Sequence, residues 1–336
     1  MVPDRASQPR VVSIAGVGFQ LAGLCVGVER GWITRAQGTE RAERILKALA
    51  ANPENRKHGL FYHFLDSKTA GQPPQAYEHV VSTIDSALFF AGVLTASSYF
   101  EGEVKRIGDG LVQEADWTAF VAIPGGATTN PFEQGFITLG WKPRNLSHPT
   151  GEGALLPYVW ADSGDEHRLV TFLAVASPRA DRVDPALYYK LRRGLGEDTP
   201  GEPLVWFPWS GALFVQIFAH CFIDYSGMGA GGPDNPAAFG VQHRARVDWW
   251  ENARRTVKMH QRKAVENPQN KPTLGVNAWG ITASDVKGGY AVPGLFPRPL
   301  AMPGARPEWD YPVGNAQNVK DNYGDGTVAP YGAGCA

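Results

Sequence analysis

The sequence predicts an all-α protein whose helical hairpins are arranged as an α/α barrel, and two observations support this prediction. Helices that are apolar on nearly every face alternate along the chain with helices that carry one apolar stripe. The alternation occurs four times, and each buried helix precedes its half-exposed partner. Such pairs indicate an inner ring of helices inside an outer ring. A solenoid of helix pairs is the alternative, although no repeat of fixed length favours it.

The first predicted pair begins with an apolar helix over residues 12–28, which is rich in Gly and Ala, so that neighbouring helices could approach closely. Its partner begins near Thr34, which forms the pattern of a capping box with Gln37. One apolar stripe then lies opposite charged residues. The stripe consists of Ala42, Ile45, Leu46 and Leu49.

The second pair combines a buried helix near residues 80–100 with an amphipathic helix after it. Ser82 can cap the buried helix, which places Asp85 at the third helical position. The amphipathic partner has an apolar stripe formed by Val104, Ile107 and Leu111.

The third pair follows a stretch of aromatic and acidic residues at 158–165. Ser163 can cap a helix in which Glu166 takes the third helical position, and we expect this helix to be buried from Glu166 to about Ala176. A capping glutamate needs no chemistry to explain it. In the amphipathic partner, Asp184 is the expected cap and Pro185 the first helical residue.

The fourth pair consists of an apolar helix over residues 210–225 and a charged helix near residues 242–265. Long connections rich in Gly and aromatic residues separate the pairs, and such connections in compact domains are usually functional. From Lys271 onward the chain is expected to be mostly loop. No linker is evident, so we expect one domain over residues 1–336.

Composition narrows the class of function. The 336 residues carry a formal net charge of −1, which gives no reason to expect nucleic acid or a membrane as partner. Many of the aromatic residues, which make up 11% of the chain, lie in polar, Gly-rich contexts that suit sugar binding, although aromatic cores explain the composition equally well. Cys25, Cys221 and Cys335 are too widely spaced for a disulfide framework or a zinc site. We expect no metal or cofactor.

Asp85 and Glu166 are the candidate catalytic residues. The inner helices of a hairpin barrel run in one direction, so both carboxylates would lie on the same face, where they could flank a glycosidic bond. One would hold a proton for the leaving oxygen, and the other would activate water or attack. A helix N-terminus favours the ionised form, so the acid needs burial or a nearby charge such as Asp162 or Asp165.

Other polar residues are weaker candidates. His220 and Asp224 stand four apart on one predicted helical face, which suits a metal site or an oriented imidazole, although a buried histidine bonded to its neighbour is more common. Further polar groups lie beside aromatic rings in loops and suit sugar hydroxyls. These are His63, Asp66, Ser284 and Asp285.

Seven segments of the chain together resemble the signature segments of the bacterial glucoamylase-like family. That family includes endo-β-1,2-glucanases and is similar to the transglycosylase region of cyclic β-1,2-glucan synthases. The resemblance extends over nearly the whole chain. In chain order the segments are GLFYHFLDSKTAG, STIDSALFFAGVLTASSYF, LGWKP, DEHRLVTFLAVASP, FAHCFIDY, WGITASD and DGTVAP.

The resemblance implies an (α/α)6 barrel with a glycoside hydrolase site in a groove at one end. Glu166 matches a glutamate proposed as a catalytic carboxylate in the family. Asp85 stands where the glucanases carry a second catalytic glutamate, and Ser82 stands where they have an aspartate. We therefore expect hydrolysis of a β-linked glucan or glucooligosaccharide, with β-1,2-glucan favoured and inversion at the anomeric carbon. A non-catalytic glycan-binding protein and a transglycosylase are the alternatives.

Our hypothesis also includes residues that contact the sugar. Aromatic rings would stack on sugar faces, and polar side chains would bind hydroxyls or position a carboxyl group. The rings are Trp141, Trp160 and Trp279; the polar residues are His63, Asp66, Asp162, His220, Asp224, Ser284 and Asp285.

The ends of the chain also bear on the prediction. The family barrel has six hairpins where we count four, so we expect a barrel that is incomplete at both ends. The first ten residues lack the apolar region of a signal peptide. Because family members are commonly exported, we expect a periplasmic or secreted protein.

Overall fold

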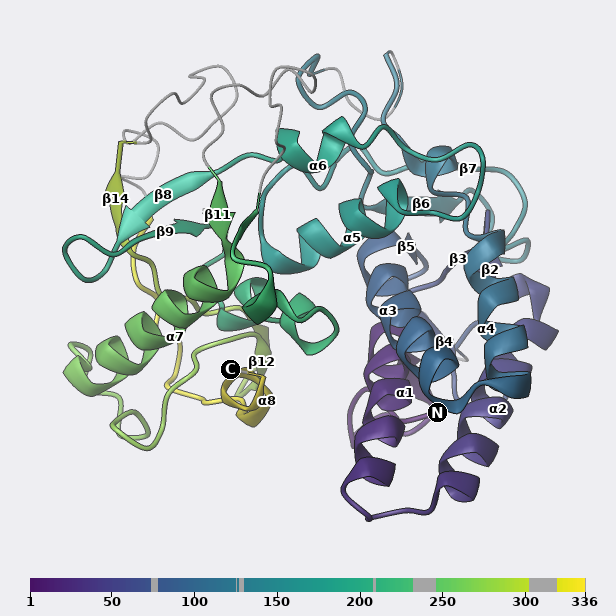
Figure 1. Ribbon diagram of the computed structural model, residues 1–336, viewed down its shortest axis with the longest axis horizontal. Helices are drawn as coiled ribbons and strands as arrows, with labels where there is room; N and C mark the ends of the chain where they lie inside the picture. Colours follow the sequence, from purple (N-terminus) through teal and green to yellow (C-terminus); the bar gives the residue numbers. More distant parts are fainter. Residues whose placement is uncertain are drawn as a thin grey trace. The chain divides into compact units, whose positions relative to one another are not determined.

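The structure is a computed structural model in which the chain falls into two compact units (Figure 1). Unit 1 comprises residues 1–160 and 169–187, and unit 2 comprises residues 161–168 and 188–336. The predicted single-domain organisation stays a prediction. The residues that the structure describes are 1–73, 78–124, 126, 130–207, 210–231, 246–301 and 319–335.

Unit 1 contains two helical hairpins. The first is α1 (Ile14–Glu29) with α2 (Arg35–Ala51), and the second is α3 (Thr83–Phe100) with α4 (Gly102–Glu114). α1 packs most extensively on α3, and α2 packs on α4 (Figure 1). α1 and α3 are apolar on most faces, whereas α2 and α4 each bury one stripe. The predicted alternation is confirmed for these two pairs.

The predicted caps of these helices are present. Thr34 accepts a hydrogen bond from the N–H of Gln37, and the Gln37 side chain accepts one from the N–H of Thr34, which completes the capping box. Ser82 caps α3 by accepting a bond from the N–H of Asp85. Local sequence therefore fixes where α2 and α3 begin.

Two glycines bring α1 and α3 into backbone contact. A Cβ atom on Gly18 would lie 2.3 Å from the carbonyl oxygen of Leu88, and one on Gly92 would lie 2.0 Å from the carbonyl oxygen of Gly18. Neither space can hold a methyl group, so only glycine allows the two helices to approach this closely. The expected close approach of the first helix to its neighbours is thus confirmed.

One residue, His63, connects the beginnings of α1 and α3. Its carbonyl oxygen accepts a hydrogen bond of 2.9 Å from the N–H of Ile14, the first residue of α1. Its own N–H donates to the carbonyl oxygen of Val80 at 2.9 Å, just before α3. The two buried helices of unit 1 therefore begin at the same end, as expected for inner helices.

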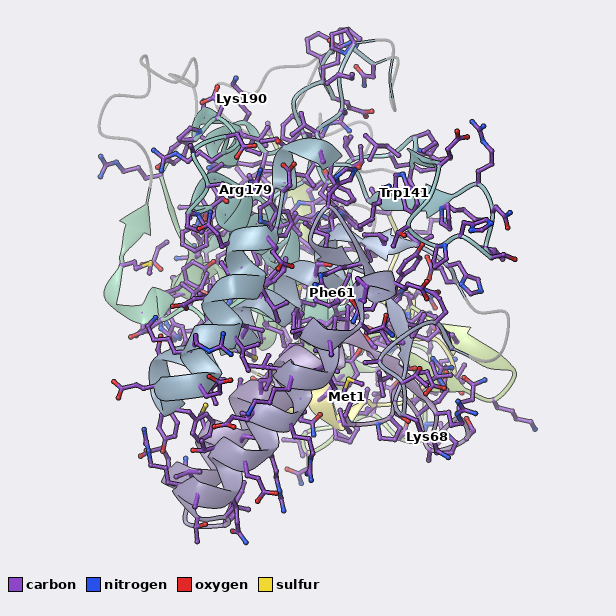
Figure 2. The ribbon with its side chains drawn as sticks, turned by 90° about the vertical axis from the view of Figure 1, so that its right-hand side faces the viewer. Met1, Phe61, Lys68, Trp141, Arg179 and Lys190 are labelled. Carbon is purple, nitrogen blue, oxygen red and sulfur yellow. The ribbon has the colours of Figure 1, made fainter. Side chains whose placement is uncertain are left out.

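The connections of unit 1 contain short antiparallel strands and two 3₁₀ helices. Strand β1 pairs with β4, β2 with β3, and β5 with β6, which in turn pairs with β7. Figure 2 shows Phe61 among the helices and Trp141 beside the strands. The elements are β1 (Val11–Ser13), η1 (Pro53–Asn55), β2 (Arg56–Lys57), β3 (Leu60–Phe61), β4 (Phe64–Asp66), β5 (Val81–Ser82), η2 (Trp117–Phe120), β6 (Gly140–Pro143) and β7 (Gly153–Leu155).

The third predicted pair is only partly formed. Helix α5 (Asp165–Val175) has its first four residues in unit 2 and the others in unit 1. Asp184 accepts a hydrogen bond from the N–H of Ala186 at 2.9 Å, as predicted for a cap, but α6 (Ala186–Lys190) is only five residues long. The sequence that follows contains two glycines and forms strand β8 (Gly194–Glu197) instead of a longer helix.

The predicted fourth buried helix is absent from unit 2. Residues 210–225 form short 3₁₀ helices, η3 (Leu213–Gln216) and η4 (Ala219–Cys221), before η5 (Tyr225–Gly227). Their backbone N–H groups bond to other segments. Leu213 N–H donates to the carbonyl of Ile281, and the N–H groups of Ala219 and His220 donate to the Asp165 carboxylate. The apolar pattern was read correctly as buried but wrongly as an α-helix.

The charged helix predicted near residues 242–265 is present as α7 (Trp249–Glu266), while residues 242–245 lie outside the described part of the chain. Asp248 caps α7 and accepts from the N–H of Glu251 at 2.9 Å. Strand β8 pairs with β9 and β14. No described helix is both long enough and apolar enough to cross a membrane. The remaining elements of unit 2 are β9 (Pro203–Trp206), β10 (Ala230–Gly231), β11 (Val247–Asp248), β12 (Ser284–Val286), β13 (Gly289–Ala291), β14 (Arg298–Leu300) and α8 (Pro330–Gly334).

Candidate functional site

Asp85, a predicted catalytic residue, lies in the first turn of α3 in unit 1. The hydroxyl of Ser82 donates to Asp85 Oδ2 at 2.5 Å and accepts from the Asp85 N–H at 3.3 Å. His63 approaches the other oxygen, with Nε2 3.4 Å from Oδ1. Hydrogen-bond donors and the positive end of a helix thus surround the carboxylate.

His63 joins Asp85 to a second carboxylate. Its Nδ1 lies 3.1 Å from Oε2 of Glu78, and its ring stacks on Phe64 with 3.8 Å between centroids. Burial by itself would lower the pKa of His63, but the charges of Asp85 and Glu78 raise it overall. In return, the hydrogen bond from His63 lowers the pKa of Glu78. The two carboxylates therefore favour the protonated imidazole more strongly than burial disfavours it.

This cluster of Asp85, His63 and Glu78 reaches solvent. The side chains of Asp85 and His63 are 14% and 25% exposed, and that of Glu78 is 54% exposed. Protons can therefore exchange with water at the start of α3. Among the predicted site residues of unit 1, Asp85 and His63 are the pair that the structure brings into contact.

Other signature segments of unit 1 gather around the same helix start. Thr83 donates from Oγ1 to the carbonyl of Thr138 at 2.7 Å, and Trp160 donates from its indole nitrogen to Thr83 Oγ1 at 2.8 Å. Phe61 N–H donates to Ser86 Oγ at 2.9 Å. The partly exposed ring of Trp160 therefore lies at the first turn of α3.

Trp141 is in a different position from the one predicted. It lies on β6 opposite Val81 and is only 6% exposed (Figure 2). The ammonium group of Lys57 lies 5.1 Å from the centre of its ring. A buried ring that already faces a cation has little surface left for a sugar, so the prediction that Trp141 stacks on substrate finds no support in this geometry.

Asp66 has a structural role. It is 1% exposed, Oδ1 accepts from the N–H groups of Lys68 and Thr69 at 2.8 and 3.0 Å, and Oδ2 forms an ion pair with Arg10. Burial would raise the pKa of Asp66, but these hydrogen bonds and the charge of Arg10 hold it below its ordinary value. The carboxylate therefore fixes its own turn, which leaves the predicted sugar contact without support.

Glu166, the other predicted catalytic residue, lies in the first turn of α5 in unit 2 and is 8% exposed. The expected capping box with Ser163 is not formed. The helix begins at Asp165, one residue later than a Ser163 cap would give, and the buried Ser163 hydroxyl makes no hydrogen bond with a described residue. Glu166 is thus the second helical residue, and its position does not come from capping.

A buried cluster of Asp165, Arg168 and His220 lies beside Glu166. The Asp165 carboxylate forms an ion pair with Arg168 and accepts from Nδ1 of His220 at 3.0 Å. Arg168 also donates to the carbonyl of Ser163 at 2.9 Å, and its guanidinium lies 3.5 Å from the centre of the Trp249 ring. None of the three side chains is more than 7% exposed.

Charge balance within this cluster determines its protonation. Burial would raise the pKa of Asp165, but Arg168 and the hydrogen bonds from His220 and Ala219 lower it overall. Burial would lower the pKa of Arg168, and the charge of Asp165 outweighs this and raises it. Asp165 is therefore a neutralised partner of Arg168 and is not the free like charge that was expected beside Glu166.

Tyr331 is a neighbour of Glu166 that the sequence did not indicate. Burial raises the pKa of Tyr331 to about 12, and the charge of Glu166 adds to this rise. The Tyr331 hydroxyl donates to the carbonyl of Ala283 and lies 3.4 Å from Thr282 Oγ1. Tyr331 therefore joins the C-terminal helix to the segment that carries Trp279, Ser284 and Asp285.

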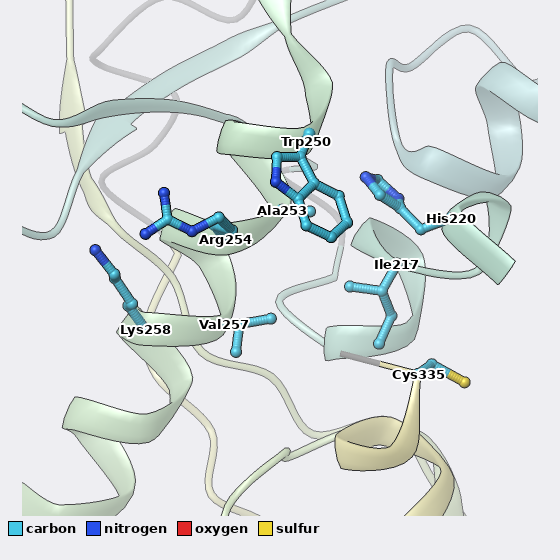
Figure 3. A pocket seen from close by; sticks show the side chains of 8 residues that line it. All are labelled: Ile217, His220, Trp250, Ala253, Arg254, Val257, Lys258 and Cys335. Carbon is cyan, nitrogen blue, oxygen red and sulfur yellow. The ribbon is translucent and has the colours of Figure 1, made fainter. Parts of the chain in front are cut away.

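His220 and Asp224 do not face each other. Asp224 is exposed and caps η5, where it accepts from the N–H of Ser226 at 3.0 Å. His220 is oriented by Asp165 and lies 3.2 Å from the carbonyl of Trp249 through Nε2. It lines a hollow of about 260 Å³ that Trp250 also lines (Figure 3). His220 is therefore an oriented imidazole, but its partner is Asp165 and not the predicted Asp224.

The other predicted contacts of unit 2 differ in exposure. Trp279 is partly buried and packs on the cluster of Leu213, Ile217 and Ala253. Asp162 is 7% exposed and forms a backbone bridge with Arg192. On β12 the side chain of Asp285 is exposed, whereas the hydroxyl of Ser284 is buried.

Within the described ranges, no three His, Cys, Asp or Glu side chains are grouped closely enough to hold a metal ion. Asp85 belongs to unit 1 and Glu166 to unit 2. The pairing of these two carboxylates across one groove therefore stays a prediction.

Comparison with known proteins supports the resemblance of the sequence. An exo-β-1,2-glucooligosaccharide sophorohydrolase of Parabacteroides distasonis is 24% identical over 96% of this chain. The chain spans about two fifths of the length of that relative, 41%. An endo-β-1,2-glucanase structure from Chitinophaga pinensis, with sophorotriose and glucose, has a TM-score of 0.66 at 21% identity over 87% of this chain and 66% of its own.

A β-1,2-glucanase structure from Parabacteroides distasonis has a TM-score of 0.62 at 21% identity, and covers 85% of this chain and 41% of its own. These likenesses show a shared fold. The model of the Glycoamylase family, described as "Putative glucoamylase", matches residues 158–336, more than half of the chain. The match includes the segments around Glu166, His220 and Asp285. The chain belongs to the Glycoamylase family.

Proposed function

We propose that this protein is a glycoside hydrolase that acts on a β-linked glucan or glucooligosaccharide, with β-1,2-glucan as the favoured substrate. The observation that carries the proposal is the solvent-reaching cluster of Asp85, His63 and Glu78 at the start of a buried helix. Membership of the Glycoamylase family and the names of its relatives, which act on β-1,2-linked glucans, support it. An (α/α)6 barrel is the proposed complete fold.

The two carboxylates would have different roles. Asp85 receives hydrogen bonds from Ser82 and faces the imidazole of His63, so it suits the base that activates water. Glu166 is buried next to the apolar body of α5 and close to Tyr331, so it suits the acid that protonates the leaving oxygen. A base that acts on water gives inversion.

Several other side chains are proposed to contact the sugar. The rings of Trp160 and Trp279 are only partly buried, and stacking on a sugar is proposed for their exposed parts. Polar contacts are proposed for groups near either carboxylate. These are His63, Asp162, His220, Ser284 and Asp285.

The test is hydrolysis of a panel of linkage-defined glucans by Asp85→Asn and Glu166→Gln variants, with the anomer of the first product identified by NMR. Loss of a general acid or base should lower kcat about 10²–10⁴-fold. Asp181→Asn is the matched control, because Asp181 is an exposed carboxylate bound to Arg179 in unit 1. A full rate in either variant would remove that residue from the mechanism.

The same assay separates the alternatives. Binding of sophorooligosaccharides without product over long incubation would identify a glycan-binding protein, and longer products at high substrate would identify a transglycosylase. Asp85 is one methylene shorter than the glutamate that the related glucanases carry at this position, so Asp85→Glu is tested as well. A higher rate in this variant would show that the reach of Asp85 limits turnover.

A further inference from the structure

A second, smaller cavity in unit 2 has no role in the proposed hydrolysis. It encloses about 130 Å³ and is lined by residues from α5, α6 and α7 and from the segments before β8 and around η5. An apolar cavity of about 150 Å³ is large enough for benzene. A glucosyl ring with its hydroxyl groups is larger than benzene, so this cavity suits a smaller occupant. The lining residues that matter here are Ser163, Arg168, Tyr188, Arg193, Tyr225 and Trp249.

Two guanidinium groups line this cavity, and none of its described lining residues is acidic. Arg168 lies 3.5 Å and Arg193 5.9 Å from the centre of the Trp249 ring. Both guanidinium groups are nearly buried, at 2% and 8% exposed. The aromatic face and the buried positions hold the two cations in place, so their direction is set before any ligand arrives.

The tyrosine hydroxyls add donors to the cavity. The hydroxyls of Tyr188 and Tyr225 lie within range of the positive charge of Arg168, which lowers their pKa against the larger effect of burial. A guanidinium only donates, so Arg168 cannot accept the O–H protons of these two tyrosines. Burial raises the pKa of both tyrosines, which keeps these protons in place.

Two buried polar atoms at this cavity make no hydrogen bond with any described residue. One is the hydroxyl of Ser163, which is 4% exposed, and the other is Nε of Arg168. Buried polar atoms in folded proteins nearly always have a partner, so each atom without one needs an explanation. A ligand that accepts hydrogen bonds would supply that partner.

We propose that this cavity binds a small oxyanion of the phosphate or sulfate class. The arrangement of donors from Ser163, Tyr188 and Tyr225 with the guanidinium of Arg193 is complementary to an ion with several acceptor oxygens. The oxyanion would occupy a place next to the segment that precedes α5. The proposal concerns binding alone, so it stands or falls separately from the proposed hydrolysis.

A calorimetric titration of the purified protein with inorganic phosphate, at constant ionic strength, tests the proposal. We expect saturable binding to one site, competition by sulfate, and no displacement by sophorose. Tyr225→Phe removes one donor and should weaken binding about tenfold, and Arg193→Met should weaken it further. Tyr323→Phe is the matched control, because Tyr323 is a buried tyrosine whose hydroxyl donates to Lys263 instead.

A second pair of variants protects the test against misfolding. Ser163→Ala should weaken phosphate binding, whereas Ser97→Ala should not, although the Ser97 hydroxyl in α3 is also buried and without a described partner. Melting temperatures measured without phosphate identify any variant that is unfolded. Absence of saturable binding by the wild-type protein would overturn the proposal. So would equal affinity in the Tyr225→Phe, Ser163→Ala and control proteins.

Discussion

Two aspartate–histidine pairs, one in each unit, invite comparison. In unit 1 His63 lies 3.4 Å from Asp85, and in unit 2 His220 lies 3.0 Å from Asp165. Both carboxylates belong to the first turn of a helix. The first pair is partly exposed, and a second carboxylate, that of Glu78, lies beside its histidine. The second is buried.

The third partner decides what each pair can do. Beside Glu78 and Asp85 the pKa of His63 is raised, and its ring is exposed enough to exchange protons with water. The group beside the buried pair is Arg168, whose charge balances that of Asp165 where no solvent reaches. The same two groups are therefore suited to proton transfer in one unit and to holding the structure together in the other.

The largest expected effect comes from removing the third partner of the buried pair. Arg168→Met would leave Asp165 buried without its cation, which should destabilise the protein by about 3–5 kcal/mol in urea unfolding followed by circular dichroism. Arg168→Lys, which keeps the charge but not the planar stacking on Trp249, should fall between Arg168→Met and the wild type.

Arg106→Met is the matched control for this prediction. Arg106 forms an ion pair with Glu103 on the exposed face of α4, so its loss should change stability little. Equal destabilisation by Arg168→Met and Arg106→Met would show that burial does not distinguish the two ion pairs.

The exposed pair can be disturbed through α1, the helix that packs on α3. Gly18→Ala places a methyl group against the backbone of α3 and should cost about 1–3 kcal/mol, because the helices must separate. Gly23→Ala, in the same helix but with nothing within 4 Å, should instead stabilise the protein by up to about 1 kcal/mol. Thermal unfolding of both variants measures the two changes in stability relative to the wild type, which should have opposite signs.

A smaller effect is expected on turnover. If His63 positions Asp85, His63→Gln should lower kcat about tenfold, or about 1.4 kcal/mol, and change the pH profile of hydrolysis while KM changes less. His79→Gln is the control, because His79 bonds to Gln72 and not to a carboxylate. An unchanged pH profile in His63→Gln would show that the imidazole does not act through Asp85.

The two pairs should also respond to pH in opposite directions. The pKa of His63 is raised on folding, so its contribution to stability is complete below the unfolded pKa of about 6.5 and is lost as pH rises through the folded value. The pKa of Asp165 is lowered, so its contribution is present above about 3.9 and is lost as pH falls through the folded value.

Unfolding free energies of His63→Gln and Asp165→Asn, each measured against the wild type over a pH series, check these directions. The loss of unfolding free energy in His63→Gln, relative to the wild type, should become smaller as pH rises. The loss in Asp165→Asn should become smaller as pH falls. Parallel curves for either variant would contradict the assigned direction for that residue.

Local sequence signals predicted local structure well. The caps formed by Thr34 and Ser82 depend on residues three positions apart, and both are present. The buried stripe of α2 follows helical spacing and is also present. The sequence likewise placed Asp85 at the start of a buried helix, where the structure has it.

Contacts between residues far apart in the sequence could not be predicted from such local signals. Residues 210–225 have a helical apolar pattern, but their backbone donors bind Ile281 and Asp165, which nothing in the local pattern indicates. Arg168 and Tyr331 were missed for the same reason, because each matters through a neighbour from another segment. Ser163 had the spacing of a cap, yet it faces a cavity instead.

Both the main chain and the side chain of His63 make contacts that matter, so the position of its ring is coupled to that of the hairpins. Its peptide groups hold the beginnings of α1 and α3, while its ring contacts Asp85. The ring therefore cannot be repositioned without loosening the hairpins, and the hairpins cannot shift without moving the ring. Heating should thus impair proton transfer before the helices melt, and a change that tunes the chemistry here should also alter heat tolerance.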